Sequence, residues 1–267
     1  MMPLFFEPQP LAMRWIKRLM GVFIVAFVGI KLITVWFGTR FFINLLSLSP
    51  TNFIDGHIWC FVTYAFLHED FWHILCNLWL FYVLCKFLLI HELTIKQLLI
   101  LFFAGVIIGG VFWALLNLQH PYYTLLGASA GVATLFTYFC LLYPEKTISL
   151  FLFFVFPIQI KTLWCFFLFL GYDLINCLLY ETQGMTHIAH SAHLGGILVG
   201  FLAFRYAKYR ESRPAKVCKA TAQYRVHIET ENVIEDVPFG ILKKLQDEGL
   251  DSLSTEERKW LERYRKL

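Results

Sequence analysis

The sequence predicts a polytopic, all-α membrane protein, and three observations support this fold class. Of the 267 residues, 58% are hydrophobic, 18% are aromatic and only 16% are charged, a composition far from that of a soluble domain. Apolar runs of about twenty residues, long enough for a helix to cross a bilayer, recur along the chain. The net charge of +4 is small and much of it lies near the C-terminus. The charge is therefore informative about the orientation of the chain in the membrane, and it argues against a nucleic-acid partner.

Six membrane-spanning helices are expected from these apolar runs. The stretch ISLFLFFVF, residues 148–156, is too short to cross and is followed by Pro157, so we expect an interfacial segment there. A seven-span alternative would require this segment to cross as well. The expected spans are residues 15–37, 72–90, 96–117, 123–143, 160–180 and 186–206.

Positive charge gathers at one end of the expected spans. Lysines and arginines precede the first span, follow the sixth and occupy two connections on the same side, whereas the opposite loops carry mainly acidic residues. The positive-inside rule therefore places both termini in the cytoplasm. The basic residues are Arg14, Lys17, Arg18, Lys86, Lys96, Lys146, Lys161, Arg205, Lys208, Arg210 and Arg213, and the opposite loops hold Asp55, Glu69, Asp70 and Glu181.

Composition divides the chain into four regions. The loop between the first two spans, residues 38–71, is rich in aromatic residues, so we expect it at the membrane interface or packed on the bundle. The last region has the pattern of two short helices. The regions are a cytoplasmic head (1–14), a six-span membrane domain (15–206), a linker (207–237) and a small cytoplasmic helical hairpin (238–267).

Four of the polar residues within the expected spans matter most for function, namely His73, Asn77, Ser129 and His193. Polar groups there are costly and often functional, although each residue alone is also compatible with helix packing or a buried hydrogen bond. His73 starts the second span, Ser129 lies about six residues into the fourth and His193 about seven into the sixth. These spans enter from the same side, so all four residues fall within the outer ~10 Å of the membrane.

This arrangement is suited to nucleophilic catalysis. A serine hydroxyl becomes an effective nucleophile when a base such as His193 takes its proton. An oxyanion would find donors in Asn77, in His73 and in the N–H groups at the amino end of the Ser129 helix. GASAG also matches the G-x-S-x-G elbow of α/β-hydrolases, but that elbow requires a preceding strand, which the expected spans exclude.

Three motifs, in this order, resemble those of the rhomboid family of intramembrane serine proteases in its bacterial, six-span form. They lie in the second, fourth and sixth expected spans, and the resemblance covers roughly residues 15–206. LHEDFWHILCN carries H-x4-H-x3-N through His68, His73 and Asn77; GASA is similar to GxSG, with Ser129; AHLGGILVG is similar to AHxxGxxxG, with His193 and Gly196.

The resemblance implies a six-helix, rhomboid-like bundle that cleaves transmembrane segments by a Ser129–His193 dyad. It implies that the N–H of Ser129, together with His73 and Asn77, holds the oxyanion. Transmembrane protein substrates and the lipid bilayer are the implied partners, the cell inner membrane is the implied location, and the oligomeric state stays open. No cofactor or metal is implied, and the seven cysteines have no metal-binding spacing. Gly127, His68 and Gly196 are the expected supporting residues.

Three positions depart from the family pattern. Ala130 replaces the glycine after the serine, and Cys60 replaces an arginine that follows Trp59 in the first loop. Ala133 falls where many relatives place an aromatic residue that stacks on the catalytic histidine. We therefore expect support for the histidine to come from elsewhere, from Tyr138 or Trp79. No third acid is evident.

The fifth span contains two polar residues, Asp173 and Asn176. They are interpreted as a buried hydrogen-bonded pair or as part of substrate access, since the resemblance implies that this span lines the substrate gate. Two alternatives to a protease remain. One is a catalytically weak or inactive rhomboid-like protein that binds membrane helices. The other is a small-solute or proton transporter, which would predict paired discontinuous spans.

Overall fold

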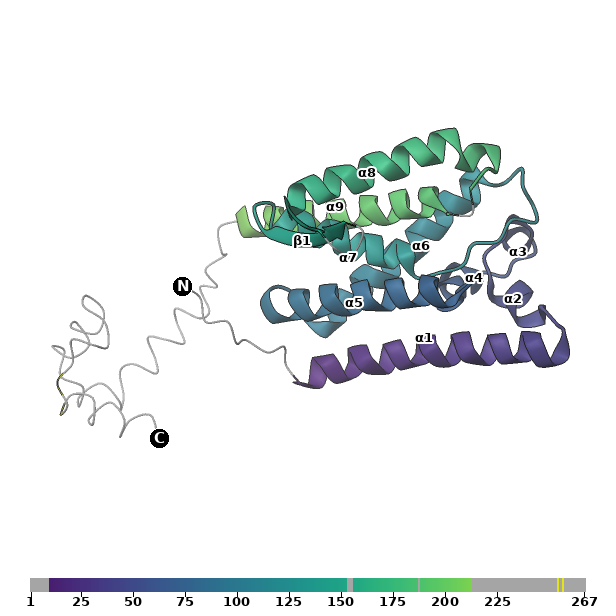
Figure 1. Cartoon of the computed structure of the whole chain (residues 1–267), viewed down its shortest axis with the longest axis horizontal. Helices are drawn as coiled ribbons and strands as arrows, with labels where there is room; N and C mark the ends of the chain where they lie inside the picture. Colours follow the sequence, from purple (N-terminus) through teal and green to yellow (C-terminus); the bar gives the residue numbers. More distant parts are fainter. Residues whose placement is uncertain (1–9, 153–155, 187, 213–253, 255, 257–267) are drawn as a thin grey trace, which may run out of the picture. The chain divides into compact units, whose positions relative to one another are not determined.

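Six long helices form the framework of the structure, a computed structural model that describes residues 10–152, 156–186, 188–212, 254 and 256. The chain divides into two units, Met1–Glu211 and Ser212–Leu267, and the first contains nearly all of the described residues. The long helices are α1 (Pro10–Phe37), α5 (Phe71–His91), α6 (Ile95–Leu116), α7 (Ser129–Leu142), α8 (Thr162–Leu179) and α9 (His190–Ser212) (Figure 1).

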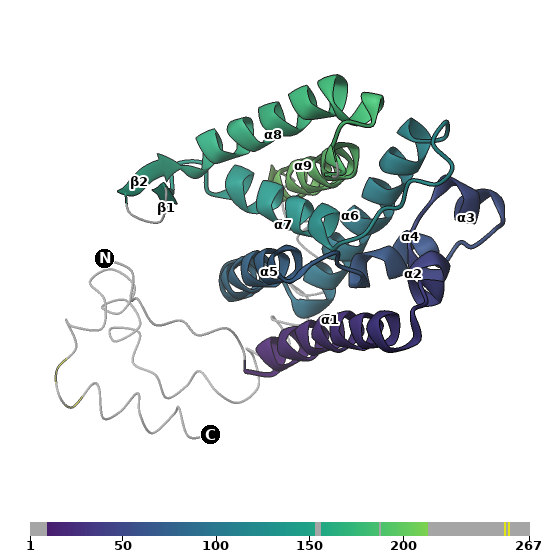
Figure 2. The same ribbon diagram turned by 45° about the vertical axis from the view of Figure 1, so that its right-hand side comes forward.

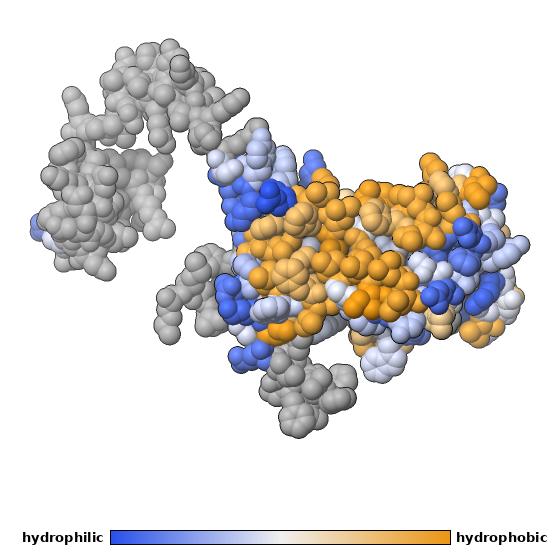
Figure 3. Space-filling view, turned by 90° about the horizontal axis from the view of Figure 1, so that it is seen from above, coloured by the Kyte–Doolittle hydropathy of each residue, from blue (hydrophilic) through white to orange (hydrophobic). Residues whose placement is uncertain are grey.

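The helices have the length and surface of a membrane domain. Figure 3 shows apolar side chains over the middle of the face drawn, with hydrophilic residues towards its ends. The prediction of a polytopic, all-α membrane protein is therefore confirmed. Among the described residues, α7 is apolar but shorter than a full span, and four helices are long and apolar enough to cross: Leu11–Phe37, Phe71–Ile90, Ile95–Leu116 and Thr162–Gln183.

The long first loop packs on the bundle through short helices. The buried Tyr64 donates a hydrogen bond from its hydroxyl to the carbonyl of Val106 at 2.7 Å. The indole N–H of Trp59 and the thiol of Cys60 both contact the carbonyl of Leu45, at 3.0 and 3.3 Å. The loop is thus anchored even though Cys60 stands where the family has arginine. Its helices are α2 (Phe41–Leu46), α3 (Pro50–Ile54), α4 (Cys60–Thr63) and η1 (Tyr64–Phe66).

Helix α7 lies at the centre of the bundle, in contact with α5, α6 and α8, and Figure 2 shows it beside α9 as well. The hydroxyl of Thr134 donates to the carbonyl of Gly196 on α9 at 2.9 Å. A Cβ atom added to Gly196 would lie 2.2 Å from the carbonyl oxygen of Ala130. The two backbones can approach this closely only because glycine has no side chain.

Two expected spans begin several residues later than the apolar pattern indicated. The fourth was expected over residues 123–143, but α7 begins at Ser129, because Leu125 pairs with Leu48 in an antiparallel bridge and Gly127 has a φ of +112°. This backbone conformation favours glycine and interrupts helical geometry. The sixth was expected over residues 186–206, but α9 runs from His190 to Ser212. Ser129 is therefore the first residue of its helix and not the sixth.

The connection between α7 and α8 is a β-hairpin, where a short interfacial segment was expected over residues 148–156. Strands β1 (Thr147–Leu152) and β2 (Phe156–Lys161) pair antiparallel, with Thr147 opposite Lys161. Pairing satisfies the backbone groups of a segment that is too short to cross as a helix. The predicted C-terminal hairpin over residues 238–267 lies outside the described residues, apart from Ser254 and Glu256.

Candidate active site

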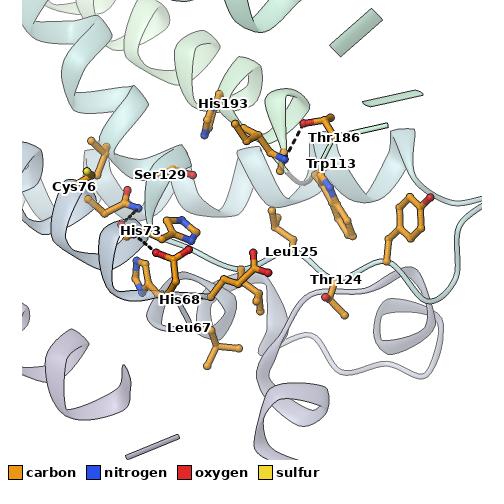
Figure 4. A pocket seen from close by; sticks show the side chains of 18 of the residues that line it. Leu67, His68, His73, Cys76, Trp113, Thr124, Leu125, Ser129, Thr186 and His193 are labelled. Atoms are coloured by element: carbon orange, nitrogen blue, oxygen red, sulfur yellow. Dashed lines mark hydrogen bonds between the residues drawn. The ribbon is translucent and has the colours of Figure 1, made fainter. Parts of the chain in front are cut away.

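Polar residues from three helices line a cavity of about 1110 Å³. Its lining includes His73 and Asn77 from α5, Ser129 from α7 and His193 from α9, together with His68 from the loop before α5. In Figure 4, Ser129 lies between the imidazoles of His193 and His73. His73 and His193, about 120 positions apart in the sequence, thus line the same cavity. This agrees with the expectation that they lie at a similar depth in the membrane.

The loop before α7 presents Ser129 to this cavity. The N–H of Gly127 donates to the carbonyl of Tyr64 at 3.0 Å, which ties the loop to the packed first loop. A Cβ atom on Gly127 would lie 2.6 Å from Nε2 of His73. Both this contact and the positive φ require glycine at this position. Since Ser129 is the first residue of α7, its N–H is one of those without an acceptor inside the helix.

The α5 side of the cavity is fixed by local hydrogen bonds. The carboxylate of Asp70 accepts the N–H of His73 at 2.9 Å and caps the helix, and this bond lowers the pKa of Asp70. The side-chain amide of Asn77 donates to the carbonyl of His73 at 2.9 Å. The ring of His68 meets that of His73 edge-on, with 4.9 Å between centroids. Burial lowers the pKa of His68 to about 4, so this ring is neutral near pH 7.

His193 is held by residues of α8. Its Nδ1 atom lies 3.0 Å from Oδ1 of Asp173, and its ring is 5.9 Å from that of Phe169 between centroids. Its contacts thus come from the fifth span and not from Tyr138 or Trp79, which were expected to support it. Trp79 points away from the bundle, with 67% of its surface exposed.

Asp173 is the site residue whose contact with His193 the sequence did not reveal. Its Oδ1 atom also lies 2.6 Å from Nδ1 of His190, and both side chains are fully buried. The expected pairing of Asp173 with Asn176 is wrong, because Asn176 donates to the carbonyl of Tyr172 at 2.7 Å. An ionisable residue inside an expected span was the available signal, but the sequence did not show which side chain faced it.

A second acid anchors the start of α9. Glu181, in the short helix η2 (Glu181–Gln183), is buried. Its carboxylate accepts the N–H of Ser191 at 2.7 Å and the hydroxyl of Ser191 at 2.5 Å. A carboxylate at a helix N-terminus satisfies free N–H groups and interacts favourably with the helix dipole. Glu181 therefore stabilises the first turn of α9, which carries His193.

The contacts of His193 leave one of its ring nitrogens for the cavity. Nδ1 faces Asp173, so Nε2 is the nitrogen that remains available to a group in the cavity. Within the part of the chain that the structure describes, Ser129 forms no hydrogen bond with His193. Such bonds are often long or absent without a substrate and tighten when one binds. The arrangement combines an alcohol, an imidazole and several N–H donors in one cavity.

Taken together, the fold and the cavity define a polytopic helical membrane protein with a cavity that both Ser129 and His193 line. Comparison with known proteins agrees with this class. The Rhomboid domain family model matches residues 55–210, more than half of the chain and the whole of the candidate site. The chain therefore belongs to the rhomboid family.

One relative extends this comparison. The "RHOMBOID-like protein 12, mitochondrial" of Arabidopsis thaliana is 28% identical over 208 residues. The aligned region is 71% of this chain and 58% of the relative, so the chain spans less than two thirds of the relative's length.

Proposed function

We propose that this protein is an intramembrane serine endopeptidase that cleaves transmembrane segments of other membrane proteins. The observation that carries the proposal is the convergence of Ser129, His193, His73 and Asn77 on one cavity. Membership of the rhomboid family supports it, because members of this family are in general intramembrane serine proteases.

In the proposed reaction, the hydroxyl oxygen of Ser129 attacks the carbonyl carbon of a substrate peptide bond. Nε2 of His193 takes the hydroxyl proton as the Oγ–C bond forms, and the carbonyl electron pair moves to its oxygen. The tetrahedral intermediate then collapses, and the imidazolium gives its proton to the leaving amine. Water attacks the acyl-enzyme by the same route and restores the serine.

The oxyanion would be held by donors from two helices. The N–H of Ser129 lies at the amino end of α7, where the helix dipole favours negative charge. The amide of Asn77 is directed to the carbonyl of His73 at 2.9 Å, and its second N–H is free to turn to the substrate. Removing one such donor typically lowers the rate by about 10²–10³.

The cavity also suits the water and the substrate that this reaction requires. Its rim includes loop residues such as the exposed Tyr122, so water can reach the acyl-enzyme. A substrate helix has its own backbone hydrogen bonds, and its peptide carbonyl becomes accessible only after local unwinding. We therefore expect cleavage near small or helix-weak residues.

We also place both termini on the cytoplasmic side of a cell inner membrane. The basic residues gather at the end of the bundle that carries the N-terminus of α1 and the C-terminus of α9. A reporter fused to the C-terminus tests this orientation. Fluorescence of a C-terminal green fluorescent protein without activity of a C-terminal alkaline phosphatase is expected, and the opposite pattern would reverse the topology.

The chemical proposal is tested by labelling with a fluorophosphonate, which reacts with activated serines. Full-length protein in detergent is compared with Ser129→Ala and His193→Ala, and the melting temperature of each variant is recorded as a control for folding. Labelling that requires both residues supports the protease. A folded wild-type protein that does not label would contradict it and would favour a rhomboid-like protein that binds membrane helices without cleaving them.

A further inference from the structure

A buried carboxylate on α8 contacts both histidines of α9. Oδ1 of Asp173 lies 2.6 Å from Nδ1 of His190 and 3.0 Å from Nδ1 of His193. Only 1% of the Asp173 side chain is exposed. A buried carboxylate needs hydrogen-bond donors, because an unpaired charge away from water is costly. The two imidazoles supply them to Oδ1 when each carries its proton on Nδ1, while Oδ2 is buried without a hydrogen-bond partner among the described residues.

The position of Asp173 has a consequence for His193. His193 lines the cavity, whereas neither Asp173 nor His190 does. The carboxylate therefore contacts the side of the imidazole that faces away from Ser129. A proton held on Nδ1 leaves a lone pair on Nε2, which is the form that a base needs in order to accept the serine proton.

We infer that Asp173 is a positioning residue, which extends the Ser129–His193 pair to a Ser–His–Asp arrangement. It keeps Nδ1 of His193 protonated, orients the ring and stabilises the imidazolium that forms when Nε2 accepts the proton of Ser129. Asp173 itself transfers no proton. His190 orients the carboxylate by donating to the same oxygen. This inference rests on the proposed function.

The same three side chains could be read as metal ligands, since their ligand atoms all lie within 4.8 Å of one another. The distances favour hydrogen bonding. Two ligand atoms on a tetrahedral zinc, each about 2.0–2.1 Å from the metal, are about 3.3 Å apart. The separation of 2.6 Å between Asp173 and His190 is shorter than that and is typical of a charge-assisted hydrogen bond.

The first experiment measures the rate of fluorophosphonate labelling between pH 5 and pH 9 for full-length wild type, Asp173→Asn and Asp173→Ala. Leu174→Ala is the matched control, because Leu174 is next to Asp173 on α8 and 46% of its surface is exposed. Both Asp173 variants are expected to label about 10²–10⁴ times more slowly, as in other serine–histidine–acid enzymes. The control is expected to stay within about twofold, as surface substitutions usually do.

The pH profile separates positioning from a merely structural role. Loss of the carboxylate destabilises the imidazolium, so the acidic limb of the profile is expected to move to lower pH. Among the described residues, the other titratable groups near His193 are His190 on its own helix, Glu181 from η2 and His73 from α5, and all of them are retained in both variants. Slower labelling with an unshifted limb and a reduced melting temperature would assign Asp173 to stability alone and overturn the inference.

A second measurement observes the ring of His193 directly in the wild-type protein. Nitrogen-15 NMR of histidine-labelled protein reports which ring nitrogen of His193 is protonated, with the resonance assigned by its loss in His193→Ala. Protonation of Nδ1 supports the inference. Protonation of Nε2 alone, or a shift of the resonance on adding Zn²⁺ that Asp173→Asn abolishes, would contradict it.

These outcomes also separate the inference from the proposed function. If the wild-type protein labels through Ser129 and the Asp173 variants label equally fast, the result supports the proposed protease function and contradicts the positioning role of Asp173. If wild type does not label at all, the proposed function falls, while the NMR measurement still decides whether Asp173 holds the proton of His193 on Nδ1.

Discussion

Substitution of Gly196 by alanine tests whether the contact between α7 and α9 sets the geometry of the site. The new Cβ atom would lie 2.2 Å from the carbonyl oxygen of Ala130 and 3.1 Å from Oγ1 of Thr134. A backbone carbonyl cannot rotate away as a side chain can. The two helices must therefore separate by roughly 1 Å, and overpacking of this kind typically costs about 1–3 kcal/mol.

The separation would act directly on the two residues proposed to react. Ser129 immediately precedes Ala130 on α7, and His193 lies one turn before Gly196 on α9. A misplacement of about 1 Å can lower a rate by about 10². We therefore expect Gly196→Ala to reduce the rate of fluorophosphonate labelling by about that factor, with a lower melting temperature in detergent.

Gly171→Ala on α8 is the matched control, because nothing lies within 4 Å of the Cβ atom that it would add. Alanine in the middle of a helix is favoured over glycine by about 0.5–1 kcal/mol. The control is thus expected to label normally and to melt at the same or a slightly higher temperature. Labelling of Gly196→Ala at the wild-type rate would refute the argument that this contact positions Ser129 against His193.

Three further predictions follow from individual contacts. Gly127→Ala places a methyl group against His73 at a backbone φ of +112°. The resulting strain is about 1–3 kcal/mol, so we expect the rate of labelling to fall at least tenfold. Labelling at the wild-type rate would contradict this. Glu181→Gln keeps the shape of the cap but removes its charge from Ser191, which should lower the free energy of unfolding by about 1–2 kcal/mol, measured by thermal melting against wild type. Burial lowers the pKa of His68 from 6.5 to about 4, so the folded state binds fewer protons between these values. Protonation of His68 therefore does not reduce the free energy of unfolding above pH 6.5, but it lowers this free energy by up to about 3 kcal/mol as the pH drops to 4. His68→Gln should remove this part of the pH dependence of the melting temperature.

The order and content of the main helices followed from the sequence with little ambiguity. Apolar runs of the required length mark helices that cross a membrane, because unpaired backbone groups are not tolerated in lipid. The residues of the candidate site were also visible, since polar groups such as His73 and Ser129 stand out in apolar runs. Their proposed roles in catalysis stay predictions until labelling is measured.

The ends of helices were less predictable than their centres. The run that includes residues 123–128 is apolar enough to continue α7, yet Leu125 bonds to Leu48 and Gly127 leaves helical geometry. A contact between residues nearly eighty positions apart decided this boundary. Hydropathy reports only the solvent that a segment prefers and not the partner that its backbone finds.

By itself, the sequence determined that this chain is a helical membrane protein, and it predicted that Ser129 and His193 lie near each other. Only the tertiary structure decided that Asp173 faces His193 and His190 and that Glu181 holds the start of α9. The physical reason lies in the membrane environment. A helix that is apolar on most of its surface carries no clear periodic signal of which face meets its neighbours, so its rotation is set by packing.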